Sequence, residues 1–162
     1  MSLLYRGPAL EDLHASYAKD GRTDGRAPVR ATQSVRVEAA PERVWQVLSD
    51  VAGWSALDPA IHVDELPGGV AVDAPFRWRN GRARIRSRFA VVEPGRELTW
   101  TGVSSGARAV HRHVLHPLDG GATLLESEES MAGPFLTLLS GSEKLSQGMA
   151  VWLGAVKTAA ER

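Results

Sequence analysis

The sequence predicts an α+β fold in which one long C-terminal helix covers a face of a curved antiparallel sheet. Segments with the two-residue alternation of β-strands follow one another through the middle of the chain. Turn signals rich in glycine and proline separate these segments, and the last twenty or so residues have the spacing of an amphipathic helix. A run of strands followed by a helix is typical of an α+β layer fold rather than of an alternating α/β fold.

A short helix outside this layer is predicted over residues 8–19. Leu10, Leu13 and Tyr17 recur there at helical spacing, and a turn-rich connection follows. No internal repeat or low-complexity stretch indicates a further domain. We therefore expect a helix with its connection and then one main domain, divided as residues 1–29 and residues 30–162.

The next segment predicts a strand followed by a helix. Residues 31–38 alternate as a strand does, and Pro41 suits the first turn of a helix that we expect to end at Gly53. Apolar side chains share one face of that helix: Val44, Val47, Leu48 and Val51. Residues 55–62 then indicate a tight second helical turn, which leads into a strand at residues 62–66.

The central strands include the strongest hairpin signal of the chain, Asn80-Gly81. Four arginines follow it at every second position: Arg82, Arg84, Arg86 and Arg88. A strand has a period of two, so these arginines share one face, and burying four unpaired guanidinium groups would be prohibitive. We expect a solvated face there rather than a nucleic-acid stripe. Two further strands are predicted over residues 108–116 and 123–129.

Residues 142–162 predict the long C-terminal helix. Its apolar stripe is formed by Leu145, Met149, Trp152 and Val156. Ser142 suits the N-cap position, where a hydroxyl oxygen accepts a free backbone N–H. Gly148 and Gly154 either weaken this helix or allow another element to pack closely against it.

The composition excludes several classes of function. Lys plus Arg and Asp plus Glu both number 19, so the net charge is zero, which disfavours nucleic acid and anionic membranes as electrostatic partners. The absence of cysteine excludes disulfides, thiol catalysis and thiolate metal sites. The first residues lack the pattern of a signal peptide, and no apolar stretch approaches the ~20 residues of a membrane span. We expect a cytoplasmic protein with no membrane insertion and no cofactor.

Three stretches resemble the START-like, polyketide cyclase/dehydrase (SRPBCC) superfamily. They are VRVEAAPERVWQVLSDVAGWSALDPAI at residues 35–61, VVEPGRELTWTG at residues 91–102, and HRHVLHPLDGGATLLESEESMAG at residues 111–133. The resemblance covers roughly residues 30–160 and implies a helix-grip fold, with a cavity between the curved sheet and the C-terminal helix. The chain departs from the pattern at Leu57, Asp58 and His113, so the identity of a ligand does not carry over.

Three of the five histidines lie close together, at His111, His113 and His116. Strand alternation and the resemblance together place His111 and His113 toward the cavity and His116 on the other face. A metal site needs a third ligand, for which Glu129 is the only good candidate, and the cupin spacing is missing. We therefore expect no metal and interpret the two inward histidines as cavity-lining residues.

A catalytic interpretation of the same residues remains open. Glu129 with His111 would form a proton-transfer pair suited to aldol-type cyclisation or dehydration, as in a cofactor-free polyketide cyclase or dehydratase. The alternative is a buried couple that only fixes the sheet. If the strand register shifts by one residue, Glu128 takes the place of Glu129.

Our first hypothesis is that the chain binds a small hydrophobic or aromatic molecule, and the cyclase is the second. The third is a protein-client or stress-associated interaction module, which an exposed apolar groove along the final helix would favour. Residues 134–141 form an apolar stretch. Three roles are open for this stretch: a flap over the cavity, ordinary packing, or the contact of a homodimer. The expected cavity residues are His113, Trp78, Trp100, Phe76, Phe89, Ile85, Leu57, Leu125, Met131, Met149 and Trp152.

Overall fold

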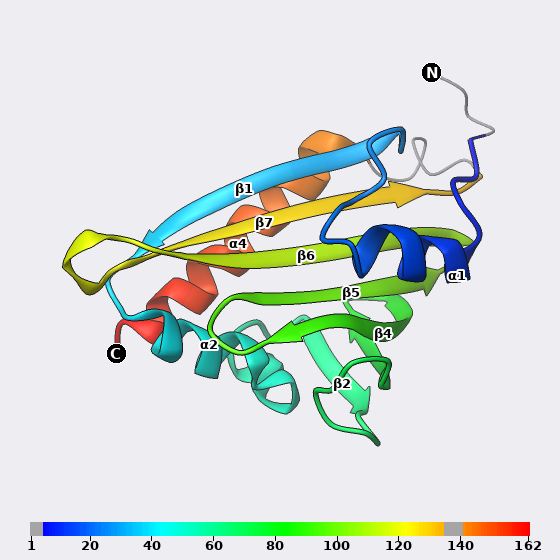
Figure 1. Ribbon diagram of the computed structural model, residues 1–162. Helices are drawn as coiled ribbons and strands as arrows, with labels where there is room; N and C mark the ends of the chain where they lie inside the picture. Colours follow the sequence, from blue (N-terminus) through cyan, green and yellow to red (C-terminus); the bar gives the residue numbers. More distant parts are fainter. Residues whose placement is uncertain (1–4, 135–140) are drawn as a thin grey trace.

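A seven-stranded antiparallel sheet forms the centre of the molecule in the computed structural model, which describes residues 5–134 and 141–162 (Figure 1). The strands lie in the order β1-β7-β6-β5-β4-β3-β2, so the first strand pairs with the last and every other neighbour is consecutive in sequence. Their bounds are β1 Val29–Val37, β2 Ile61–Glu65, β3 Pro75–Asn80, β4 Ala83–Glu93, β5 Glu97–Ser104, β6 Ala107–Pro117 and β7 Thr123–Ala132.

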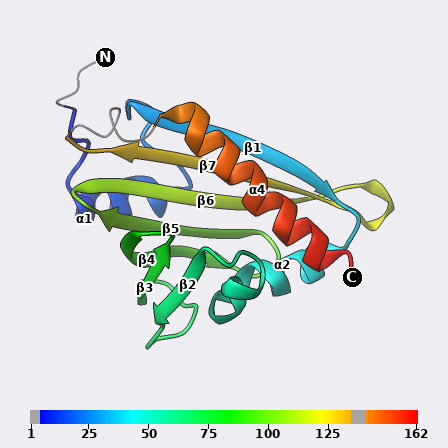
Figure 2. The ribbon, with the colours of Figure 1, turned by 180° about the vertical axis from the view of Figure 1, so that it is seen from behind.

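Helices cover both faces of this sheet. The long helix α4 (Ser142–Ala160) crosses one face, and α1 (Leu10–Asp12) lies on the other, as the two opposite views show (Figures 1 and 2). The helix α2 (Pro41–Ser49) packs against α4 and is followed by a 3₁₀ turn, η2 (Val51–Ala56). A second 3₁₀ turn, η3 (Asp119–Gly121), joins β6 to β7. This arrangement is the helix-grip α+β fold, so the predicted fold class is confirmed.

The apolar core lies beneath the C-terminal half of α4. Leu153, Val156 and Ala160 of the helix are buried there with Val44 and Leu48 of α2. The strands contribute every second side chain to this core, because alternate residues of a strand point to the same face. These strand residues include Leu98, Leu115 and Leu125, all at most 2 % exposed.

Two helix ends differ from the predictions. The helix α2 ends at Ser49 and not at Gly53, because Asp50 leaves the helical conformation (φ −76°, ψ 66°) and η2 begins directly after it. Ser142 is not an N-cap but the first residue of α4, and Gly141 occupies the cap position. The Ser142 hydroxyl instead accepts a hydrogen bond from the backbone N–H of Arg30, at 3.1 Å, and so ties the helix to β1.

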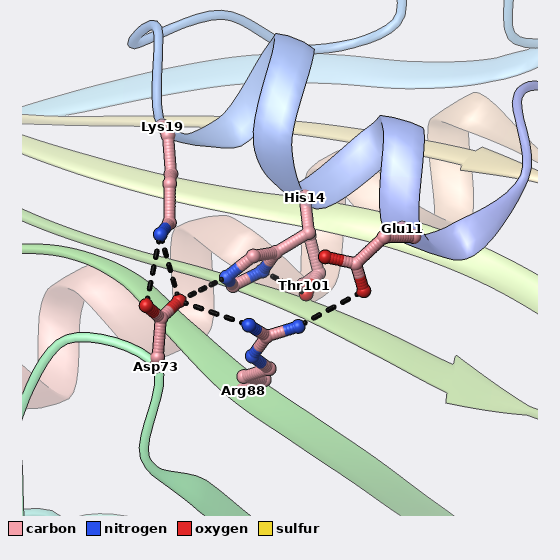
Figure 3. A network of polar contacts seen from close by, with 6 residues as sticks. All are labelled: Glu11, His14, Lys19, Asp73, Arg88 and Thr101. Atoms are coloured by element: carbon pink, nitrogen blue, oxygen red, sulfur yellow. Dashed lines mark hydrogen bonds and ion pairs between the residues drawn. The ribbon is translucent and has the colours of Figure 1, made fainter.

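The N-terminal segment continues from α1 into a turn of π-helix, η1 (Leu13–Ala18), which packs on the outer face of the sheet. A small apolar cluster lies beneath it, formed by Leu13, Ala18, Ala90 and Val110. Beside this cluster His14 is fully buried and contacts Thr101 Oγ1 through Nδ1 and Asp73 Oδ1 through Nε2, both at 2.9 Å (Figure 3). Because an ionised carboxylate only accepts, Nε2 donates to Asp73 and Nδ1 accepts from Thr101.

Asp73 is the point at which several charges meet. Lys19 and Arg88 also contact its carboxylate, at 2.9 Å and 3.2 Å. The hydrogen bonds from Lys19 and His14 lower the pKa of Asp73 to about 2, so the carboxylate stays ionised. Burial lowers the pKa of His14, so its imidazole stays neutral. The N-terminal helix is therefore fixed to the sheet by a neutral histidine between a hydroxyl and a carboxylate.

Replacing His14 with leucine is expected to lower the free energy of unfolding by about 2–3 kcal/mol, since Thr101 loses its partner in a buried site and Asp73 loses one donor. Urea denaturation measures this difference. The control is His116→Leu, which changes a half-exposed histidine and should stay within about 0.5 kcal/mol of the parent. Equal effects of the two substitutions would contradict a fixing role for His14.

Candidate functional site

A cavity of about 640 Å³ lies beneath the N-terminal half of α4. Its walls come from strands β2 to β7 and from the segment of Trp54 and Asp58, and α4 contributes residues between Lys144 and Trp152. The core and the cavity therefore divide the inner face of the sheet between them, one under each half of the helix. This volume falls in the range of about 300–1,000 Å³ that small-molecule sites occupy.

Nine of the thirteen residues expected at the site line this cavity: Trp78, Ile85, Trp100, His111, His113, Glu129, Met131, Met149 and Trp152. The other four lie in the core instead. Phe76 and Phe89 stack on each other with ring centroids 4.3 Å apart, Leu125 is fully buried, and Leu57 packs against the same cluster. All three strand residues share the inward face, but they lie nearer to α2, where the core fills the space.

Tryptophan side chains form much of the apolar wall. Trp54 lies at their centre, with ring centroids 5.8 Å from Trp78, 5.2 Å from Trp100 and 5.3 Å from Trp152. The indole N–H of Trp54 donates to the Leu48 carbonyl at 3.0 Å, and that of Trp78 donates to the Ser87 hydroxyl at 3.0 Å. With these donors bound to the protein, the two rings present apolar surface to a ligand.

His111 and Glu129 form the ionisable pair of the cavity. They lie directly opposite each other on β6 and β7, and His111 Nδ1 is 3.1 Å from Glu129 Oε1. Both side chains keep some access to the cavity, at 14 % and 11 % exposure. Trp100 stacks on the imidazole at 5.3 Å with an interplanar angle of 17°. Glu129 contacts Nδ1, so the other nitrogen of the His111 ring, Nε2, takes no part in this pair.

His113 is different, although it lies on the same strand face. It is 3 % exposed, and neither ring nitrogen has a hydrogen-bond partner among the described residues. Burial, and to a lesser extent the neighbouring His111, lower the pKa of His113 to about 3. It stacks on Trp100 with centroids 4.9 Å apart. At neutral pH this imidazole is therefore an uncharged ring that packs against Trp100.

His116 lies outside the site, half-exposed on the opposite face of β6 and 3.7 Å from Glu126. Within residues 5–134 and 141–162, no three histidine, aspartate or glutamate side chains come together as a metal site would require. No helix in the same part of the chain is long and apolar enough to cross a bilayer. The predicted flap or dimer segment, residues 134–141, falls almost entirely outside the described residues.

A family model described as polyketide cyclase/dehydrase and lipid transport matches residues 28–161. The chain belongs to this family. The resemblance seen in the three sequence stretches is thereby confirmed. No curated protein matches the sequence.

Solved structures with a similar fold support the architecture. A hypothetical protein from Helicobacter pylori, jhp0584, is 18% identical, with 100% of this chain and 98% of that chain covered and a TM-score of 0.74. DynU16, a protein of the dynemicin biosynthetic locus, is 20% identical (80% and 46% covered, TM-score 0.64). The Aha1 dimer from Colwellia psychrerythraea is 16% identical (82% and 96% covered, TM-score 0.63). At these identities the likeness shows the fold.

Several cavity residues of this family member were not among the expected ones. Trp54, Asp58, Asn80, Lys144 and Gly148 all line the cavity. Gly148 had a visible signal, because a glycine inside an amphipathic helix weakens it unless the site needs open space. No sequence signal pointed to Lys144 or Asn80. Both are exposed polar residues, and whether they line the cavity depends on how α4 lies across the sheet.

Acid is expected to destabilise the protein through His113. In the unfolded chain this histidine takes up a proton near its ordinary pKa of 6.5, whereas in the fold it does so only at about 3. Between these values the unfolded state binds more protons, so the free energy of unfolding falls as pH falls. Lowering the pH from about 7.5 to about 4.5 should cost about 3 kcal/mol through this residue alone.

Urea denaturation of the parent and of His113→Leu at both pH values measures that cost. The substitution removes the titrating group and keeps the site apolar, so the variant should lose less stability on acidification than the parent. Other groups, including His14, titrate equally in both proteins and cancel in the comparison. Parallel pH profiles would contradict the burial of a neutral His113.

Proposed function

We propose that the protein binds a small hydrophobic or aromatic molecule in the cavity beneath α4. The observation that supports this proposal is the cavity itself, about 640 Å³ in volume and walled by Trp54, Trp78, Trp100 and Trp152. Aromatic walls give a ligand a large apolar contact area and favour the stacking of flat rings. The polyketide cyclase/dehydrase and lipid transport family and the fold shared with DynU16 agree with such a ligand.

Polar groups at two places in the cavity would orient the ligand. The first place is on the sheet, where His111 and Glu129 lie. The second is formed by three partly or fully exposed polar residues of the lining: Asp58, Asn80 and Lys144. A few placed polar groups in an apolar pocket are typical of sites that fix the direction of a ligand. The ligand therefore has an apolar body with polar substituents.

Filling the cavity from the helix is expected to block binding. Gly148 lines the cavity, and a side chain added there meets nothing within 4 Å, so Gly148→Phe projects into the ligand space. The affinity for the apolar dye 1-anilinonaphthalene-8-sulfonate should fall at least about tenfold, or about 1.4 kcal/mol. Fluorescence titration measures it.

The matched control is Gly154→Phe, on the same helix with equally open space but outside the cavity lining. Both substitutions replace a helical glycine and should not weaken the helix. The control should bind the dye as the parent does. Equal dye affinity in all three proteins would contradict binding in this cavity, and native mass spectrometry of the purified protein would then show whether a molecule is carried elsewhere.

A second function, acid–base catalysis, is favoured by the 3.1 Å contact between His111 and Glu129 inside the cavity. Neutral His111 would take a proton at Nε2 from a carbon next to a carbonyl group, while Nδ1–H donates to Glu129. The carboxylate stabilises the imidazolium that forms. The enolate then attacks a second carbonyl carbon of the same molecule, and the imidazolium returns the proton to the alkoxide that forms. In the dehydration His111 takes a second proton from the same carbon and returns it to the hydroxyl group, which leaves as water while the carbon–carbon double bond forms. This sequence is an aldol cyclisation with dehydration and needs no oxidant.

A proton-abstraction probe tests this function before any substrate is known. The base-induced ring opening of 5-nitrobenzisoxazole should be faster with the protein than in buffer, and His111→Phe or Glu129→Gln should lose about 100-fold or more of that acceleration. His116→Phe is the control and should keep it. If the two cavity variants bind the dye normally and retain the full rate, His111 and Glu129 do not catalyse proton transfer.

The client-binding hypothesis has less support. Among the described residues, the large hydrophobic side chains that are exposed are Leu10, Val72 and Val151, and of these only Val151 lies on α4. A single exposed valine among the described residues of α4 does not form the apolar groove that client binding would favour. The dimer named for the Colwellia psychrerythraea structure is a property of that protein.

A further inference from the structure

Arginines are concentrated on the outer face of the hairpin formed by β3 and β4. Six of the 19 basic residues of the chain fall between residues 77 and 88. All six are arginine, and together they form what we call the arginine face: Arg77, Arg79, Arg82, Arg84, Arg86 and Arg88. The zero net charge of the whole chain therefore hides a strong local excess of positive charge.

The pairing of the two strands places like charges against each other. Arg77 lies directly opposite Arg86, and Arg79 lies directly opposite Arg84. Cβ atoms of such pairs are about 5 Å apart, and like charges at this position reduce the stability of a sheet. Along β4 the arginines follow at intervals of about 7 Å, twice the rise of a strand residue. The result is a grid of arginines on the outer face of the hairpin, held at a cost to the fold.

The protein neutralises only part of this grid. Asp64 accepts two hydrogen bonds from Arg79, and Glu65 lies 3.7 Å from Arg77. Arg88 forms ion pairs with Asp73 and Glu11. Within the described residues, Arg82, Arg84 and Arg86 contact no acidic side chain, and all three are exposed. Three neighbouring positive charges thus lack a counter-charge of the protein's own.

We propose that the arginine face docks the protein onto an anionic lipid surface, without insertion. Guanidinium groups bind phosphate oxygens through paired N–H donors, and a cluster of exposed arginines on one face can contact several phospholipid headgroups together. Single-stranded nucleic acid fits less well, because its binding depends on exposed aromatic rings on which bases stack. Among the described residues the large hydrophobic side chains that are exposed are one leucine and two valines, with no aromatic ring among them.

The position of the face relates it to the cavity. Trp78 and Ile85 line the cavity from the inner side of the same hairpin, and Asn80 and Ala83 line it at the tip. A lipid surface held on the outer side lies one sheet thickness from the cavity wall. Apolar molecules dissolve in bilayers, so docking would bring the cavity to where its ligands are concentrated. Docking itself does not depend on the ligand, because the arginines contact headgroups only.

Vesicle co-sedimentation of the full chain tests the proposal. Vesicles of phosphatidylcholine with about 30 mol% phosphatidylglycerol should carry the protein down, in a way that weakens with added salt, whereas pure phosphatidylcholine should not. Arg84→Glu with Arg86→Glu should lower the partition coefficient at least about tenfold. The control is Arg30→Glu with Arg162→Glu, two exposed arginines elsewhere, which makes the same change of net charge and should keep most of the binding.

Each other outcome overturns the proposal. Wild-type protein that stays in solution with the anionic vesicles shows that the face does not dock on lipid, and an equal loss in the control pair shows a general charge effect. A salt-sensitive gel shift of a single-stranded oligonucleotide, without vesicle binding, would assign the face to nucleic acid. Dye binding by the Arg84→Glu and Arg86→Glu variant reports the cavity separately, so that failure of docking and failure of ligand binding remain distinct.

Discussion

One hydrogen bond holds the boundary between the core and the cavity. The Trp54 indole N–H donates to the Leu48 carbonyl at the end of α2, and this contact places the ring at the centre of the inner face. On one side the ring meets Phe76 of the core at 6.2 Å, and on the other it meets Trp100 of the cavity at 5.2 Å. A fully buried ring in this position closes the packed half of the molecule and forms a wall of the open half.

The same constraint explains what the sequence could predict and what it could not. Alternation along a strand decides which side chains share a face, and together with the family resemblance it placed His111, His113 and Glu129 on the inner face. Alternation carries no information on position along the strand relative to α4. Phe76 and Phe89 therefore had the expected face but lie in the core, because the helix crosses the sheet at an angle that no local pattern records. The fold class needed only the order of elements, which the sequence states directly.

His111 and His113 stack on the same tryptophan but have different surroundings. Trp100 contacts both His111 and His113, but only His111 has a carboxylate opposite it, since Glu129 pairs with residue 111 and Ser127 with residue 113. Burial lowers the pKa of His113 and keeps its imidazole neutral, and its ring nitrogens, like the Trp100 indole nitrogen, lack partners among the described residues. Unpaired buried nitrogens reduce stability. That cost is accompanied by a stacked arrangement in which Trp100 lies against both imidazole rings.

The two faces of the β3–β4 hairpin differ in chemical character. Its inner side is apolar and faces a cavity, and there Trp78 and Ile85 lie directly opposite each other. Its outer side places arginine opposite arginine, which costs stability. A surface that served only solubility would intersperse both signs of charge, as happens where Asp64 and Glu65 of β2 lie beside Arg79 and Arg77 of β3. Within the described residues Arg82, Arg84 and Arg86 have no such partner, and this is the observation on which the proposed docking to an anionic surface rests.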